Sequence, residues 1–341
     1  MTDELRRKLD RIAADAPGPD EGRDRTLRAA KRRSRVGMAM ASGVTVAAIA
    51  VSAVAVGAVL NRRSLPPVGP THTGTVTVPT PSPTPSPKPE GTLAFLRGGS
   101  IVTIRADGSA QTTLAQVNGQ SSRLAWSQQG TFVFDHIVSE ASGSIETMGP
   151  DGGNRERILG LGRPSSPDWS PDGRRVAFVT DSGALFTMSA GGSDPRAVRR
   201  ALTGEHPSWA PDGKRLAFIT TAGDVAIVAV AGGGEPQIIA SEGEASSLDW
   251  GPEGTIAFSS TLGGERFLYL VGADGRDLRA LISAPGVYAD PAWSPDGAFV
   301  AYVDIVQGRQ DVFVVSADGT STVRLTDDGS QEISPVWRPL S

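Results

Sequence analysis

The sequence predicts an all-β protein, a six-bladed β-propeller preceded by one transmembrane α-helix. The 6 tryptophans recur every 40 to 44 residues: Trp126, Trp169, Trp209, Trp250, Trp293 and Trp337. Most are followed by proline, an acidic residue and glycine, and then by an apolar run. A repeat of about 40 residues with four short strands per unit is typical of β-propellers.

The first half of each repeat predicts a tight hairpin. Its clearest copies, Pro167 to Gly173 and Pro291 to Gly297, read Pro-x-Trp-Ser-Pro-Asp-Gly and lead into apolar runs at Val176 and Val300. Proline presets φ for the turn, and glycine accepts the positive φ that reverses the chain. Each copy therefore indicates a strand, a turn and a second strand.

The second half of each repeat predicts another hairpin, because an apolar run leads into a glycine-rich turn. The six apolar runs are residues 101–104, 145–148, 184–188, 225–230, 267–271 and 312–315. Six tryptophan hairpins and six glycine-turn hairpins make six blades of four strands.

The two ends of the predicted propeller, residues 91–341, complete each other. Trp337 is followed by Arg338 and Pro339 but not by an acidic-Gly turn and strand, and that missing half stands at Glu90 to Phe95. We therefore expect the C-terminal strand to close the first blade as its innermost strand, which removes open blade edges from the ring.

The repeated tryptophan has two interpretations. A large ring present once per blade is expected to pack between adjacent blades, where it buries much apolar area. A ligand-stacking role would have to explain why all six copies are needed. The sequence favours the structural interpretation.

Residues 36–61 predict the transmembrane helix. The chain carries no charge between Arg35 and Arg62, a length that spans a hydrocarbon core of about 30 Å. The preceding residues 1–35 hold 11 Lys or Arg, so the positive-inside rule places the N-terminus in the cytoplasm and the propeller outside the cell membrane. A signal peptide cleaved near Ala53 to Ala55 is the alternative, which the long apolar segment and long head disfavour.

Residues 62–90 predict an extended stalk, because they are rich in Pro, Thr and Ser, above all from Thr80 to Pro87. Such composition favours polyproline II over a packed core. The chain has 0 cysteines, which excludes disulfides, a lipid-anchored cysteine and cysteine-ligated metals.

Residues 1–35 are predicted to be a basic cytoplasmic head. The spacing of Leu5, Leu9 and Ile12 predicts a short amphipathic helix that carries them on one face and ends at Pro17. A head of this size cannot bury its own core, so it either binds a partner or only sets topology. Its helix, proline break and arginine cluster resemble the short heads of membrane proteins that bind sigma factors, which implies a possible cytoplasmic partner.

The net charge differs between the two sides of the predicted transmembrane helix. The net charge is −4 overall and about −10 for the propeller once the basic head and stalk are subtracted. An acidic ectodomain does not suit nucleic acid, so we expect no nucleic-acid partner.

The repeat Pro-x-Trp-Ser-Pro-Asp-Gly-x-x-Val-Ala-Phe resembles that of TolB-type propellers, which are related in style to WD-type propellers. The resemblance covers about residues 90 to 341. It implies the fold, but proteins with this repeat include periplasmic scaffolds, lipoprotein accessory domains and the gating propellers of serine peptidases.

Catalytic motifs are absent from the sequence. The chain has 3 histidines, and it lacks a Gly-x-Ser-x-Gly elbow, a His-Glu-x-x-His pair, a phosphate loop and an EF-hand loop. We therefore predict no enzyme, no cofactor and no metal site.

The central channel is the remaining place for ligand chemistry. Polar residues near the tryptophans are expected to line it: Arg123, Asp168, His206, Asp249 and Asp290. They are either solvated polar groups or a site for a polar ligand or ion on the axis, held by carboxylates with His206 or Arg123 as partner.

Three functions follow from these expectations. The leading one is non-catalytic binding of a protein, peptide or envelope polymer through loop tips at one mouth of the ring. The second is a transmembrane, anti-sigma-like regulator whose head binds a cytoplasmic protein. The third is a channel-sited hydrolase or lyase.

Overall fold

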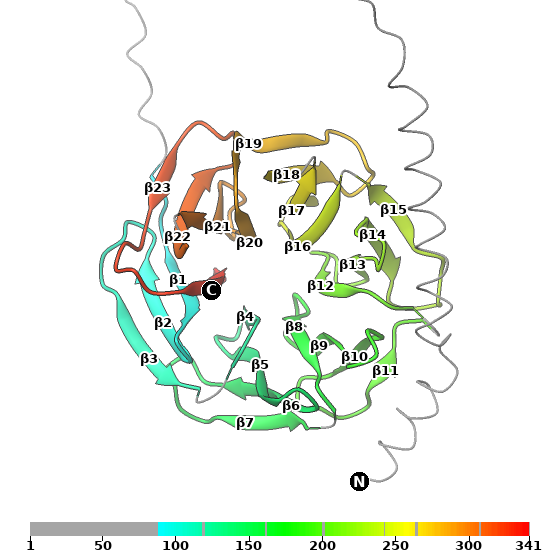
Figure 1. Ribbon diagram of the computed structural model, residues 1–341. Coiled ribbons are helices and arrows are strands. Elements are labelled where there is room, and N and C mark those ends of the chain that lie inside the picture. The colour runs from blue at the N-terminus through cyan, green and yellow to red at the C-terminus, as the bar shows by residue number, and fades with distance from the viewer. Residues whose placement is uncertain are drawn as a thin grey trace, which may run out of the picture. The chain divides into compact units, whose positions relative to one another are not determined.

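The computed structural model describes residues 88–340 apart from 118–119, 161, 200–201, 242, 263–264 and 307. In this part of the chain, 24 strands form six sheets of four strands each around a common centre (Figure 1). The predicted all-β, six-bladed propeller is confirmed. The predicted head, transmembrane helix and most of the stalk lie outside the described residues.

Each blade runs from an innermost to an outermost strand. Blade 1 contains β24 (Glu332–Trp337), β1 (Thr92–Arg97), β2 (Ser100–Arg105) and β3 (Thr112–Gln116). Blade 2 contains β4 (Leu124–Trp126), β5 (Phe132–Ser139), β6 (Ser142–Met148) and β7 (Glu156–Leu159), and blade 3 contains β8 (Ser165–Trp169), β9 (Arg175–Val179), β10 (Leu185–Ser189) and β11 (Arg196–Ala197).

The other three blades follow the same order. Blade 4 contains β12 (Glu205–Trp209), β13 (Arg215–Ile219), β14 (Val225–Ala229) and β15 (Gln237–Ala240). Blade 5 contains β16 (Glu244–Trp250), β17 (Thr255–Leu262), β18 (Glu265–Gly272) and β19 (Arg279–Gly286), and blade 6 contains β20 (Tyr288–Trp293), β21 (Phe299–Val306), β22 (Arg309–Ser316) and β23 (Thr322–Arg324).

The C-terminal strand closes the ring as predicted. β24 pairs antiparallel with β1, and Trp337 lies opposite Leu93 and Val336 opposite Ala94. The last residues of the propeller thus complete the sheet begun by its first residues.

The turns that follow the tryptophans in the clearest repeats are stabilised by the aspartate and glycine of the motif. Asp172 accepts a hydrogen bond from the backbone N–H of Arg174 (3.1 Å), and Asp296 accepts one from Ala298 (3.0 Å). Gly173 has a φ of 65°, in the left-handed region that glycine adopts without strain. The acidic residue therefore holds the turn that the glycine permits.

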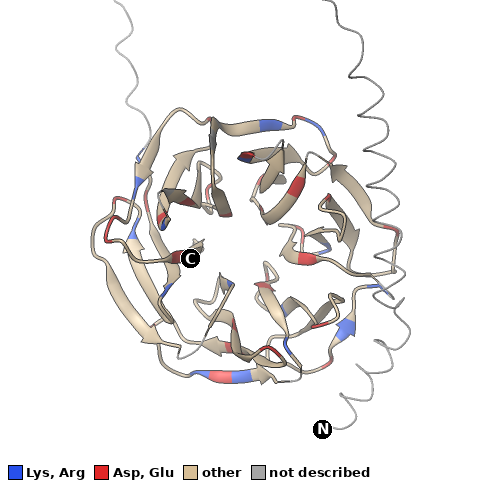
Figure 2. Ribbon diagram, in the orientation of Figure 1, with Lys and Arg blue, Asp and Glu red and all other residues tan. Residues whose placement is uncertain are grey.

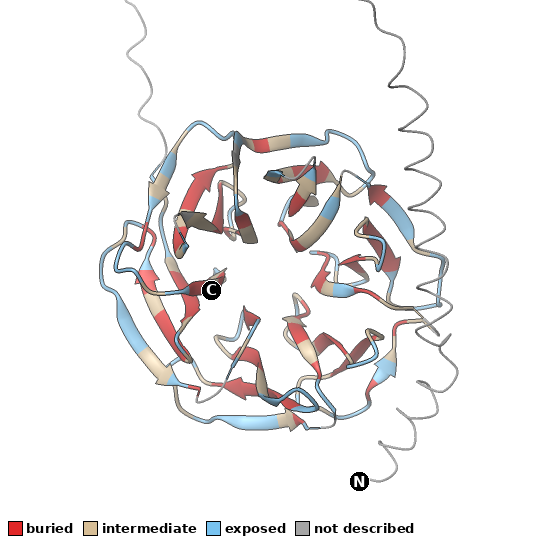
Figure 3. Cartoon of the chain, in the orientation of Figure 1, coloured by how far each residue is buried: buried red, intermediate tan, exposed pale blue. Residues whose placement is uncertain are grey.

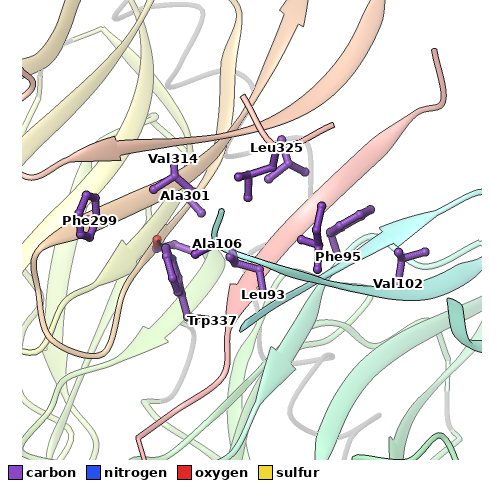
Figure 4. Close-up of a cluster of buried hydrophobic side chains, with 12 residues drawn as sticks. Leu93, Phe95, Val102, Ala106, Phe299, Ala301, Val314, Leu325 and Trp337 are labelled. Atoms are coloured by element: carbon purple, nitrogen blue, oxygen red, sulfur yellow. Dashed lines mark hydrogen bonds between the residues drawn. The ribbon is translucent and has the colours of Figure 1, made fainter. Parts of the chain in front are cut away.

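The core lies between the blades. Five of the six buried clusters contain one tryptophan together with residues of the preceding blade, and in the sixth Trp293 is partly buried and packs against the cluster. In Figure 4, Trp337 of blade 1 lies among Leu93, Ala301 and Phe299, the last two from blade 6. The inner strands are buried and the outermost ones largely exposed (Figure 3). The tryptophans thus pack against the preceding blade.

The ring has two distinct faces. On the tryptophan face, the inner strands end at the six tryptophans and turn into the second strands. On the opposite hairpin face, the second and third strands of each blade are joined.

Candidate functional site

The five predicted channel residues belong to the inner part of the ring but occupy two different positions. Asp168 and Asp249 directly precede a tryptophan, whereas Arg123, His206 and Asp290 lie three residues before one. The five residues therefore do not form one equivalent set around the ring. The missed counterparts are Ser208 at the first position, and Ser166, Ser247 and Ser334 at the second.

Residues at the first position connect blades 3 to 6. The Asp168 carboxylate accepts a hydrogen bond from the Trp209 backbone N–H (2.8 Å). Ser208 Oγ accepts one from Trp250 (3.1 Å), and Asp249 accepts one from Trp293 (2.7 Å). Because acceptor and donor always lie on neighbouring blades, these bonds hold blades 3 to 6 in register.

Residues at the second position continue the connection. Ser247 Oγ accepts a hydrogen bond from the Asp290 N–H, and Asp290 Oδ2 accepts one from the Ser334 N–H, both at 2.9 Å. Ser334 Oγ accepts one from the Leu124 N–H (2.9 Å). The chain of bonds therefore runs from blade 5 through blades 6 and 1 to blade 2.

The inner strands bulge at this second position. Ser166, His206, Asp290 and Ser334 have φ values of 52°, 49°, 48° and 51°, and the strand pairing shifts register beside them. A bulge redirects a side chain away from the regular alternation of a strand. Local bending thus aims these polar groups along the axis.

Arg123 crosses the channel. Its Nη2 donates a hydrogen bond to the backbone oxygen of Leu248 (3.0 Å). Arg123 adjoins β4 of blade 2 and Leu248 belongs to β16 of blade 5, and these strands face each other across the centre (Figure 1). The Asp135 carboxylate accepts a hydrogen bond from the Arg123 backbone N–H (3.0 Å) and so holds the backbone of the arginine in place. A buried guanidinium therefore bridges opposite walls.

The five residues influence one another electrostatically. Burial raises the pKa of Asp168 to about 7, an effect that Asp249 reinforces and Arg123 opposes. Burial also raises the pKa of Asp249. Burial and Arg123 lower the pKa of His206 to about 4, whereas Asp290 acts in the opposite direction. The structure thus brings the predicted residues into one coupled polar centre.

Asp168→Asn is expected to stabilise the protein at about pH 8 by on the order of 1 kcal/mol and to be neutral near about pH 4. The amide keeps an oxygen for the Trp209 N–H but carries no charge. Because the pKa of Asp168 is higher in the folded state, the wild-type protein loses stability as pH rises toward 7 and the variant does not. Urea unfolding at both pH values measures the difference, and an equal effect at both would contradict it.

The axial centre lacks a metal-binding cluster among the described residues. In that part of the chain, no three His, Asp or Glu side chains lie close enough together to hold an ion. The carboxylates of Asp168, Asp249 and Asp290 instead accept backbone N–H groups of neighbouring blades. Their hydrogen bonds identify them first as inter-blade connectors.

Six sheets closed by a terminal strand, each with one tryptophan packed against its neighbour, define a repeat-built β-propeller. The family model of the TolB beta propeller domain matches residues 132–294 and 206–340. The chain belongs to this family.

Individual relatives match shorter segments. The Tol-Pal system protein TolB of Syntrophus aciditrophicus is 37% identical over 90 residues, which cover 24% of this chain and 20% of the relative. The protein TolB homolog of Chlorobaculum tepidum is 29% identical over 84 residues, 25% of this chain and 19% of the relative. The aligned segments span about a fifth of these curated relatives.

Solved structures extend the likeness in fold. The crystal structure of TolB from Acinetobacter baumannii has a TM-score of 0.65 at 17% identity, covering 74% of this chain and 68% of that one. The putative TolB from Agrobacterium tumefaciens has a TM-score of 0.58 at 18% identity, covering 70% and 89%.

Within the described residues, no helix has the length and apolar character needed to span a bilayer. The predicted helix at 36–61 lies outside those residues.

Proposed function

We propose that this protein is an extracytoplasmic binding module, anchored in the cell membrane by residues 36–61, that binds a protein, peptide or envelope ligand without catalysis. One observation carries the proposal. Three of the six exposed large apolar side chains of the described residues lie on the hairpin face, namely Val138, Leu262 and Val287, which are 65%, 46% and 41% exposed. Leu262 ends β17 and Val287 follows β19, so these two lie at the same end of blade 5. Exposed apolar side chains at one end of a blade favour a protein contact there.

The shape of the hairpin face supports this choice. The strands β17, β18, β21 and β22 of blades 5 and 6 have 8 residues each, whereas β9, β10, β13 and β14 of blades 3 and 4 have 5. The longer hairpins make the rim uneven, with Leu262 at the end of β17. Loops on a rigid scaffold are the usual carriers of specificity.

Charge suggests the character of the ligand. Acidic residues are distributed over all six blades (Figure 2), in agreement with a net charge of about −10 for the propeller. Such a surface accelerates association with a basic partner and repels anionic ones. The relatives named for the Tol-Pal system make an envelope location a natural expectation for this chain.

The channel residues contribute a second contact in this proposal. Nδ1 of His206 has no hydrogen-bond partner within the described residues, whereas Asp168, Asp249, Asp290 and Arg123 are bonded. His206 therefore keeps one hydrogen-bonding atom unused, although that atom is buried. The basic head at 1–35 supplies the alternative function, a regulator that binds a cytoplasmic protein.

A photo-crosslinking amino acid at Leu262 in the full-length protein is expected to capture a discrete partner in intact cells. The same group at Ile238, which is 55% exposed on the outer strand β15, is the matched control and should capture much less. Mass spectrometry of the adducts identifies the partner. Equal adduct formation at both positions would contradict a binding site on the hairpin face.

A further inference from the structure

The tryptophan face carries a slot between each pair of adjacent blades. One wall is the tryptophan ring of a blade, and the other is the residue that begins the second strand of the preceding blade. Between blades 3 and 4, the Arg175 guanidinium lies 4.5 Å from the centre of the Trp209 ring. Its Nη2 also donates to the Gly213 oxygen (2.7 Å). This slot is filled by the chain itself.

Side chains also reach into four other slots, although a cavity of about 300 Å³ lined by residues that include Trp126, Thr92 and Arg338 remains between blades 1 and 2. Arg215 lies over Trp250 (5.1 Å), and Arg338 over Trp126 (5.9 Å). Phe299 packs in one cluster with Trp337 (Figure 4). Between blades 2 and 3, Gln129 reaches across to donate to the Asp172 oxygen (3.1 Å).

In the slot between blades 5 and 6, no arginine of the described residues lies over the tryptophan ring. The position held by Arg175 and Arg215 is Thr255 here, as it is Thr131 in blade 2 and Thr92 in blade 1. A pocket of about 160 Å³ remains, lined by residues that include Thr255, Glu253, Trp293 and Arg279. Trp293 is the one tryptophan of the six that is only partly buried.

The pocket is built around the exposed ring. A Cβ atom on Gly251 would lie 2.7 Å from Cγ of Trp293, so glycine is required for the ring to lie where it does. On the outer side, Arg279 Nη2 donates to the Ala317 oxygen (2.7 Å) and forms a wall between the blades. The pocket therefore has a fixed aromatic floor and defined sides.

We propose that this slot receives an arginine side chain from a partner protein. In the slot between blades 4 and 5, Arg215 is held by the face of Trp250 and by the Asp212 carboxylate, whose Oδ2 lies 2.9 Å from Nε. The open slot offers the same two elements, the Trp293 ring and the Glu253 carboxylate. A guanidinium in such a site stacks on the aromatic ring, and the carboxylate beside it pairs with its positive charge.

The positive charge of Arg279 opposes binding of an arginine in the slot. Its exposed guanidinium repels a cation but would attract a carboxylate. Removing that charge should therefore strengthen binding of an arginine and weaken binding of an anion. The variant Arg279→Gln therefore distinguishes the two kinds of ligand, because it should bind an arginine more tightly and an anion more weakly.

The experiment uses the full-length protein in detergent, labelled with fluorotryptophan, and N-acetyl-arginine amide as the probe. Fluorine NMR resolves the six rings, and Trp293→Phe assigns the signal of interest. We expect a saturable shift of the Trp293 signal without shifts at Trp209 and Trp250. N-acetyl-citrulline amide, planar but uncharged, should bind at least about fivefold more weakly. Equal binding of the two probes overturns the proposal.

Variants test the contacts. Thr255→Arg should fill the slot internally and abolish the shift, whereas Thr131→Arg, the same change at the equivalent position of blade 2, should leave it intact. Glu253→Gln should weaken binding and Arg279→Gln should strengthen it, each by about threefold. A shift that survives Thr255→Arg, or weaker binding in Arg279→Gln, overturns the proposal. Because this slot lies on the tryptophan face, its failure leaves the crosslinking result at Leu262 unaffected.

Discussion

Trp337→Ala is expected to lower the free energy of unfolding by about 3–5 kcal/mol. The ring is 4% exposed and belongs to the cluster between blades 6 and 1. Its Nε1 also donates to the Ala292 oxygen of blade 6 (3.1 Å). The substitution removes a large apolar surface, leaves a cavity and deprives a backbone oxygen of its donor. It acts where the last strand closes the ring, so the loss affects two blades together.

Urea unfolding followed by circular dichroism measures this effect. Leu340→Ala is the control, since Leu340 is 68% exposed three residues further on and should leave the midpoint unchanged. An unaltered midpoint in Trp337→Ala would show that closure through β24 contributes little to the stability of the propeller.

The blades were predictable because the signals that define them are local. Proline, aspartate and glycine determine a turn within a few residues, and the structure shows Asp172 bonded to the Arg174 N–H in that turn. Closure was predictable for the same reason, since half a motif at Trp337 required the other half near Phe95. The pairing of β24 with β1 confirms it.

The candidate site was harder to predict because its geometry depends on distant contacts. Arg123 and Leu248 are separated by 125 residues, and nothing local indicates that they meet across the ring. The bulge at Asp290 and Ser334 changes which side chains face the axis. A signal was nevertheless present, because serine and aspartate recur one and three residues before the tryptophans. If this recurrence is interpreted as a set of hydrogen-bond acceptors between neighbouring blades, it predicts Ser208, Ser247 and Ser334 as members of the site.

The inter-blade bonds and the slots explain why the repeats differ in detail. A ring requires each blade to hold the next, but any acceptor of suitable size serves, so Asp168, Ser208 and Asp249 fulfil the same role. The slots likewise tolerate arginine, phenylalanine or glutamine as internal cover. In the slot lined by Thr255, the Trp293 ring is only partly buried and a pocket of about 160 Å³ lies beside it.

Asp135→Ala is expected to cost about 2–4 kcal/mol of unfolding free energy, since it leaves buried donors without an acceptor. Asp135 is fully buried, and its Oδ1 accepts the backbone N–H groups of Ser122 (2.7 Å) and Arg123 (3.0 Å). Ser122 Oγ also donates to its second oxygen. The loss removes the support that holds Arg123 in position to reach Leu248.

Asp135→Asn separates hydrogen bonding from charge. Its amide oxygen can still accept both backbone N–H groups, so it should cost only about 1 kcal/mol in the same urea titration. If the two variants were equally destabilised, the carboxylate charge rather than its hydrogen bonds would be the stabilising factor. The expected ranking follows from the donors: two backbone N–H groups need an oxygen at this point, and that oxygen positions the arginine that bridges the channel.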